Sequence, residues 1–277
     1  MVSAMSDFDS INAYWGFVRT VRCERRFIFD GKAGKFLAAA RAASKSRARS
    51  IKVGHRFFRA QLGSDFVVRP TEDGEDHCGG EEEVPLPEAR LIPKPQYITR
   101  GGRANPPGFA YLYLATDEKT ALAEMRPGVG ESLTVALFEI QRDVKLVVCQ
   151  PGPDNLGEVI FEEKPLPEMV DNYVWNEIGR AFAQPVRQGD RENAYLPTQV
   201  LAEAFKAEGF DGLAYQSGLE RGRNVLLFDV SIAKLVKRYV YTLKKVRYDF
   251  EAAPNHCIYR VKDGVGRQVI EIQTESL

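Results

Sequence analysis

The sequence predicts an α+β protein in which a mixed, largely antiparallel sheet follows an N-terminal helical hairpin. Residues 8–46 repeat apolar positions at helical spacing. Downstream, segments of alternating apolar residues outnumber the helical ones, and helices do not separate them regularly. A doubly wound parallel sheet would need that regular alternation, so the pattern favours the α+β class.

Composition limits the partners of the chain. Its 277 residues allow one large domain, or one domain with an appendage. Lys+Arg and Asp+Glu balance at 38 each, so the molecule has no net positive charge that would attract nucleic acid or an anionic membrane. No apolar run approaches the ~20 residues of a membrane span, and the start "MVSAMSDFDS" lacks signal-peptide features. We therefore expect a cytoplasmic protein without nucleic-acid or membrane partners, which holds any anion locally.

The N-terminal half contains three kinds of segment. Two helical stretches joined by "DGKAG" form the expected hairpin of residues 8–46, and the period changes to that of a strand at about 52–61. Residues 65–100 are rich in Pro, Gly and acidic residues, which predicts a long surface loop that covers or flanks a site. We expect an N-terminal extension (1–48), a main domain (49–240) and C-terminal strands of uncertain role (241–277).

The C-terminal half alternates less regularly between strands and helices. Helices are predicted at 117–125, 169–184 and 196–210. Strands are predicted at 111–116, 132–141, 144–149, 211–217, 224–230, 238–252, 255–261 and 267–274.

The cysteines do not suggest a disulfide framework or a metal site. Cys23, Cys78, Cys149 and Cys257 lie far apart, so we expect free thiols. His77 beside Cys78 invites a metal interpretation, but a structural zinc site needs about four closely spaced ligands. No metal is therefore expected.

One glutamate lies at the edge of a predicted helix. In "YLYLATDEKTALAEM" the helix should start near Thr116 or Asp117, either of which can cap free N–H groups. Its buried stripe consists of Ala121, Leu122 and Met125. Glu124 then lies at the border of that stripe, as a half-buried carboxylate or as an ordinary solvent-edge glutamate.

Ser217 is the last residue of a predicted strand in "DGLAYQSGLERGRN". Small polar groups at strand ends often meet ligands, but a serine here can equally cap the backbone of a turn. Local sequence leaves both interpretations open.

Three stretches together resemble the RES domain, which is named for an arginine, a glutamate and a serine. They are "RFFRAQLG", "GRANPPGFAYLYLATDEKTALAEMRP" and "YLPTQVLAEAFKAEGFDGLAYQSGLERGRNVLLF", within residues 52–230. The resemblance implies a fold related to ADP-ribosyltransferases and the activity of toxins that destroy NAD+ by hydrolysis or phosphorolysis. The family's motif positions fall on Arg59, Arg103, Tyr113, Glu124, Ser217 and Asn224. Ala104 stands where the toxins commonly have tryptophan, which would reshape the pocket.

NAD+ cleavage suits these residues chemically. Nicotinamide leaves as a neutral ring, so the main demand is to stabilise an oxocarbenium-like ribose, which one carboxylate, Glu124, can meet. Arg59 and Arg103 offer guanidinium forks for the pyrophosphate. Tyr113 is either a stacking partner of nicotinamide or a core aromatic. We assign catalysis to Glu124, Arg59, Arg103 and Ser217, and substrate contacts to Arg59, Arg103, Asn105, Tyr113, Ser217 and Asn224.

Several alternatives stay open at the sequence level. NAD+ is expected as a substrate, with no tightly bound cofactor, and inorganic phosphate is a candidate co-substrate. The acceptor of ADP-ribose is water, phosphate or a protein side chain, the last making the protein an ADP-ribosyltransferase. A non-catalytic nucleotide- or partner-binding module is a further alternative. The resemblance also implies a small antitoxin partner, and the hairpin would cover the pocket or assemble a homodimer.

Overall fold

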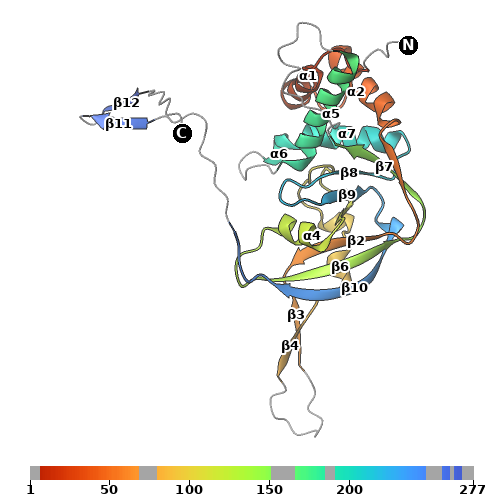
Figure 1. The fold of residues 1–277 in the computed structure, drawn as a ribbon, viewed down its shortest axis with the longest axis vertical. Helices are drawn as coiled ribbons and strands as arrows, with labels where there is room; N and C mark the ends of the chain where they lie inside the picture. The colour runs from red at the N-terminus through yellow and green to blue at the C-terminus, as the bar shows by residue number, and fades with distance from the viewer. Residues whose placement is uncertain are drawn as a thin grey trace. The chain divides into compact units, whose positions relative to one another are not determined.

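The computed structural model describes residues 7–68, 80–150, 166–184, 191–247, 258–262 and 265–269. The chain divides into two compact units, Met1–Leu243 and Lys244–Leu277. In the second unit, β11 (Ile258–Lys262) and β12 (Val265–Val269) pair as an antiparallel hairpin (Figure 1). All other described helices and strands belong to the first unit.

An eight-stranded sheet forms the centre of the first unit (Figure 1). In their order across the sheet, the strands are β1 (Ala48–Ile51), β7 (Val144–Cys149), β8 (Gly212–Gln216), β9 (Arg223–Leu227), β5 (Leu112–Ala115), β2 (Arg56–Leu62), β6 (Ser132–Ile140) and β10 (Ala233–Thr242). Of these strand pairs, β7 and β8 are parallel and the others are antiparallel. The predicted α+β class with a mixed, largely antiparallel sheet is confirmed.

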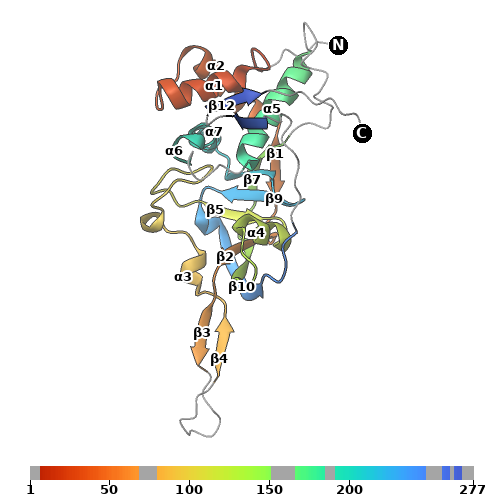
Figure 2. The ribbon, with the colours of Figure 1, turned by 90° about the vertical axis from the view of Figure 1, so that its left-hand side faces the viewer.

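A helical layer packs against β7, β8 and β9. Its members are α1 (Ala13–Arg19), which continues into a π-helix (Thr20–Glu24), α2 (Gly31–Ser44), α5 (Pro167–Ala183), α6 (Arg191–Ala194) and α7 (Leu196–Ala207) (Figures 1 and 2). One apolar cluster joins the rings of Phe17, Phe36 and Trp175 to Leu213 of β8 and Leu226 of β9. The expected N-terminal hairpin is confirmed. Within the described residues, no helix is long and apolar enough to cross a bilayer.

Helix α4 (Glu118–Met125) packs separately, against β2, β5 and β6. Its Ala121 is buried in a small cluster with Ala60, Ala115 and Val135, one residue from each of those strands. The Asp117 side chain accepts a hydrogen bond from the Thr120 N–H at 2.9 Å. Asp117 is therefore the N-cap, one of the two starts that the sequence allowed.

Two segments differ from the sequence predictions. The strand expected at 52–61 is β2 (Arg56–Leu62), because a turn at Gly54 (φ 82°) separates it from β1. The segment predicted as a loop at 65–100 contains a projecting two-stranded ribbon, β3 (Asp65–Val68) and β4 (Glu81–Val84), and the short helix α3 (Glu88–Leu91) (Figure 2). The ribbon is largely exposed, so its pairing needs no alternation of apolar residues.

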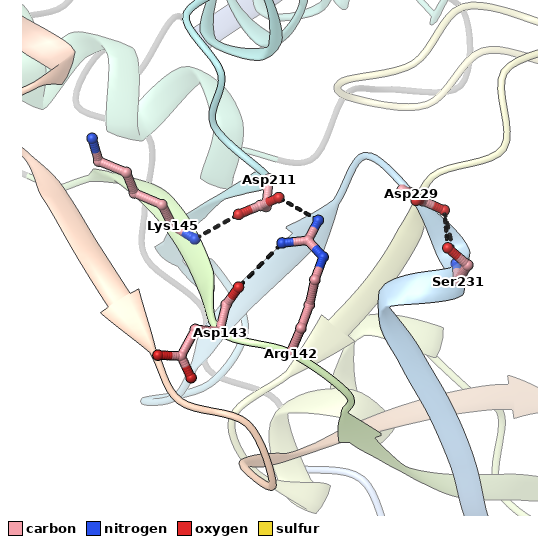
Figure 3. A network of polar contacts seen from close by, with 6 residues as sticks. All are labelled: Arg142, Asp143, Lys145, Asp211, Asp229 and Ser231. Carbon is pink, nitrogen blue, oxygen red and sulfur yellow. Dashed lines mark hydrogen bonds and ion pairs between the residues drawn. The ribbon is translucent and has the colours of Figure 1, made fainter.

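The parallel pair is fixed at its start by polar contacts around Asp211 (Figure 3). The Asp211 carboxylate accepts hydrogen bonds from the backbone N–H of Lys145, at 2.8 Å, and from Arg142 Nη2, at 2.6 Å. Arg142 also donates to the carbonyl of Asp143 at 3.1 Å. These contacts set the register in which β8 runs beside β7 toward Ser217.

Candidate active site

Glu124 lies in the last turn of α4, and its side chain is 17% exposed. Helical spacing places it three residues after the buried Ala121, at the border of the packed face. The half-buried carboxylate therefore follows from the amphipathic pattern of α4.

Two side chains, one directly after β8 and one in β9, donate hydrogen bonds to the same oxygen of Glu124. The Ser217 hydroxyl donates to Oε1 at 2.8 Å, and Asn224 Nδ2 donates to Oε1 at 2.6 Å. The Ser217 oxygen also accepts from the N–H groups of Leu219, at 3.1 Å, and Glu220, at 3.3 Å. Ser217 thus caps a turn and orients the carboxylate at once, so the two interpretations of this serine are compatible.

Arg103 faces the other oxygen of Glu124. Its Nη2 lies 3.7 Å from Oε2, and its guanidinium carbon lies 5.9 Å from the centre of the Tyr215 ring. Burial disfavours the charged guanidinium, but Tyr215 and Glu124 outweigh it and raise the pKa of Arg103. Burial also raises the pKa of Tyr215 to about 12, against the effect of Arg103. At neutral pH Arg103 is therefore charged and Tyr215 is a neutral phenol. We call Glu124, Ser217, Asn224 and Arg103 the carboxylate cluster.

Helix α7 holds the loop that carries Arg103. The Thr198 hydroxyl donates to the carbonyl of Arg103 at 2.5 Å. Gln199 Nε2 donates to the carbonyls of Gly102, at 2.9 Å, and Asn105, at 3.1 Å. The first turn of α7 therefore fixes the backbone on both sides of the arginine.

Tyr113 and Asn105 stabilise the same loop from within. Tyr113 Oη donates to Asn105 Oδ1 at 2.7 Å and accepts from the Ala104 N–H at 3.1 Å. A Cβ on Gly102 would lie 2.6 Å from Asn105 Oδ1 and 2.8 Å from Tyr113 Oη, so the turn requires glycine. Asn105 is 3% exposed and is not part of the cleft wall, so its side chain has a structural role in this structure.

Arg59 reaches the site from β2. Its Nη1 donates to the carbonyl of Tyr113 at 3.0 Å, while its Nε is buried and lacks a hydrogen-bond partner among the described residues. Burial lowers the pKa of Arg59 to about 10, so the guanidinium is still protonated at neutral pH. A buried cation with an unsatisfied donor is costly, and a bound anion would relieve that cost.

An open cleft of about 1870 Å³ connects these residues. Its wall includes Arg59, Arg103, Tyr113, Glu124 and Asn224, while Ser217 and Asn105 support it from behind. The charged residues of the wall are six arginines and two glutamates, an excess of four positive charges in a chain without net charge. They are Arg22, Arg26, Arg59, Arg100, Arg103, Arg126, Glu124 and Glu203. The cleft is therefore suited to an anionic ligand.

Several wall residues were not predicted from the sequence. Arg100 lies just before one of the stretches that carry the family resemblance and Arg126 lies at the end of the same stretch, and that position was the available signal. Tyr215 lies within a predicted strand, after the apolar Leu213 and Ala214, so nothing in the sequence indicated that its ring faces Arg103. Arg22 and Arg26 belong to the N-terminal hairpin, and no local pattern relates them to their partners Ala194 and Asn193, which are more than 160 residues away.

The described residues contain no cluster of potential metal ligands. His77 and Cys78 lie outside those residues. Cys23 is exposed, Cys149 is buried, and both are free thiols. Cys78 and Cys257 are likewise outside the described ranges.

Fold and site define an α+β protein with a cationic ligand cleft built around a carboxylate. The sequence model of the RES domain matches residues 89–251, which is more than half of the chain, so the protein belongs to the RES domain family. The resemblance seen in the sequence is thereby confirmed. The matched span includes Arg103, Glu124 and Ser217, and it begins after Arg59.

One solved structure is distantly similar. It is the crystal structure of the MbcT–MbcA toxin–antitoxin complex of M. tuberculosis, with 12% identity and a TM-score of 0.39 over 73% of this chain and 92% of that chain. A likeness at this level carries no residue roles. The comparison with curated proteins finds no match.

Proposed function

We propose that this protein cleaves the nicotinamide–ribose bond of NAD+ and transfers ADP-ribose to water or inorganic phosphate. The observation that carries the proposal is the carboxylate cluster, in which Glu124 is oriented by Ser217 and Asn224 and faces Arg103 in a cationic cleft. The resemblance of the sequence to the NAD+-degrading toxins of the RES family also supports it. A small antitoxin partner and a homodimer stay predictions.

The chemistry requires charge stabilisation and little proton transfer. When the bond between the ribose C1′ and nicotinamide breaks, the electron pair moves to the pyridinium ring, so nicotinamide leaves neutral and C1′ becomes positive. A carboxylate held beside C1′ stabilises that charge at no cost of reorientation, because two donors already fix it. Water then adds its oxygen to C1′ and releases a proton, giving ADP-ribose. Phosphate gives ADP-ribose 1″-phosphate instead.

Arginines account for the anionic part of the substrate. The Arg103–Glu124 separation of 3.7 Å exceeds a hydrogen bond, so Arg103 can engage a phosphate without breaking a hydrogen bond to Glu124. Arg59 contributes a buried guanidinium whose Nε has no hydrogen-bond partner in the described part of the chain. Guanidinium groups bind phosphate oxygens in pairs, which suits a pyrophosphate.

The test is to incubate purified protein with NAD+, with and without inorganic phosphate, and to separate the products by chromatography and mass spectrometry. We expect release of nicotinamide, with ADP-ribose or its 1″-phosphate identifying the acceptor. Glu124→Gln keeps the size of the side chain but removes its charge, and should lower turnover by about a hundredfold or more.

The matched control is Glu118→Gln, the same change on the same helix. The Glu118 carboxylate accepts hydrogen bonds from Tyr239 and Tyr241 and is not part of the cleft wall. Turnover should survive that change. Intact NAD+ with the wild-type protein in both buffers would contradict the proposal, and label from NAD+ on an added protein would indicate an ADP-ribosyltransferase.

A further inference from the structure

The N-terminal extension contributes directly to the cleft. Val21, Arg22, Arg26 and Phe27 form part of its wall, although the RES match begins only at residue 89. They lie in the π-helix Thr20–Glu24 and in the segment that leads to α2. The extension is therefore part of the ligand site as well as of the helical layer.

The arginines of this segment fall into two classes. Arg19 pairs with Glu24 at 3.9 Å, and Arg25 pairs with Asp30 at 2.6 Å. Neither of these two arginines belongs to the cleft wall.

Arg22 and Arg26 have neutral partners instead. Arg22 Nη2 donates to the carbonyl of Ala194 at 3.0 Å, and Arg26 Nη2 donates to Asn193 Oδ1 at 3.0 Å. Neither has a carboxylate partner among the described residues. Within the described part of the chain, the arginines that face the cleft therefore have no carboxylate partner, whereas those that face away from it do.

An aromatic ring accompanies these two cations. Phe27 is 91% exposed although it is part of the cleft wall. An exposed phenylalanine gains nothing from the protein core, but a nucleobase can stack on it. Two guanidinium groups and one free aromatic face together match an adenosine nucleotide, with the phosphate next to the adenosine on these arginines and the base on the ring. The phosphate next to the nicotinamide ribose is then left to Arg59 and Arg103.

The size of the cleft leaves room for this second set of contacts. Pockets for small ligands commonly measure about 300–1,000 Å³, and this one measures about 1870 Å³. Glu124 comes from α4, and Arg22 and Arg26 come from the helical layer. A ligand that reaches both must be extended, as a dinucleotide is.

We propose that Arg22, Arg26 and Phe27, which we call the arginine subsite, bind the adenosine monophosphate part of the substrate. The extension thereby makes the enzyme bind dinucleotides more tightly than mononucleotides. This inference rests on the proposed cleavage of NAD+ and adds to it the part of the site that selects the substrate.

The test measures binding of ADP by calorimetry, without any turnover. We compare wild-type protein with Arg22→Gln/Arg26→Gln and with the matched pair Arg19→Gln/Arg25→Gln. The first pair should weaken ADP binding by about tenfold or more, since hydrogen bonds to charged groups are lost, and the second should leave it unchanged. Equal affinity of ADP for all three proteins would overturn the inference.

Phe27→Ala separates binding from folding. The ring is almost fully exposed, so its removal should leave the melting temperature unchanged while weakening ADP binding several-fold. Unchanged ADP binding by this variant would remove the ring from the site and overturn the assignment.

Kinetics distinguish failure of this inference from failure of the proposed function. The Arg22→Gln/Arg26→Gln variant should raise KM for NAD+ about tenfold, without changing cleavage of nicotinamide mononucleotide, which lacks the adenosine monophosphate part of NAD+. Loss of ADP binding in a protein that never cleaves NAD+ would support the arginine subsite and contradict the cleavage. Cleavage of NAD+ by the Arg22→Gln/Arg26→Gln variant with an unchanged KM would support the proposed function and contradict the arginine subsite.

Discussion

The carboxylate cluster and the arginine subsite hold their charges in opposite ways. Glu124 is 17% exposed, with two hydrogen-bond donors on one oxygen and Arg103 facing the other. Arg22 and Arg26 are exposed and contact only neutral oxygens among the described residues. Fixed, partly buried groups suit a transition state, whereas exposed and uncompensated groups suit capture of a ligand. The difference predicts that changes in the cluster affect kcat and changes in the subsite affect KM.

The largest effect is expected when both side chains that donate hydrogen bonds to Glu124 are removed. Ser217→Ala/Asn224→Ala should lower kcat about a hundredfold with little change in KM, because each hydrogen bond to a charged group contributes about 1.5–3 kcal/mol. Steady-state kinetics of nicotinamide release measure this effect. Ser231→Ala, a change at a turn serine that contacts Asp229, is the control and should have no effect. A pure KM effect of the double variant would contradict a positioning role.

Replacing two glycines by alanine should change the stability of the protein in opposite directions. A Cβ on Gly222 would collide with the side chains of Asp117 and Thr120, which cap α4. Gly222→Ala should therefore destabilise the protein by about 2 kcal/mol and lower its Tm by roughly 4–8 °C. Gly16 of α1 is exposed, with nothing within 4 Å of an added Cβ, so Gly16→Ala should raise stability by about 0.5–1 kcal/mol. Thermal unfolding measures both, and shifts of equal sign would contradict the packing described.

Arg126 combines strain with a position in the cleft. It ends α4 in the left-handed region, with φ 50°, where glycine is favoured. Arg126→Gly should raise the free energy of unfolding by about 0.5 kcal/mol, because relief of strain exceeds the greater freedom of the unfolded chain. The same variant should weaken ADP binding. Denaturant titration and calorimetry check the two effects, and a less stable variant would show that the arginine side chain stabilises this turn.

Salt should give the smallest effect and still separate the two groups. Added salt screens the interactions of exposed charges. The Debye length is about 8 Å at physiological ionic strength and shorter above it. KM for NAD+ should therefore rise about two- to threefold, while kcat stays nearly constant because Glu124 and Arg103 are shielded by protein. Potassium chloride titrations of both parameters test this. A kcat that falls in parallel with the rise in KM would argue against two differently exposed groups.

The sequence predicts local features well and long-range contacts poorly. Capping and helical periodicity act over a few residues. They predict a start of α4 near Asp117 and the edge position of Glu124. The ribbon β3–β4 was missed because its two largely exposed strands need no hydrophobic alternation. Asn105 stays a predicted substrate contact, and in this structure its side chain forms hydrogen bonds with Tyr113 and the carbonyl of Phe109. Arg22 could not be assigned, because its partner Ala194 is 172 residues away.

The dispersal of the site along the chain has a consequence for synthesis. Arg22 is made early, whereas Asn224 belongs to β9, which lies between β8 and β5 in the middle of the sheet. Since ribosomes deliver the N-terminal part first, neither the sheet nor the carboxylate cluster can close before β9 has emerged. A chain that ends before β9 therefore lacks Asn224 and cannot assemble the carboxylate cluster.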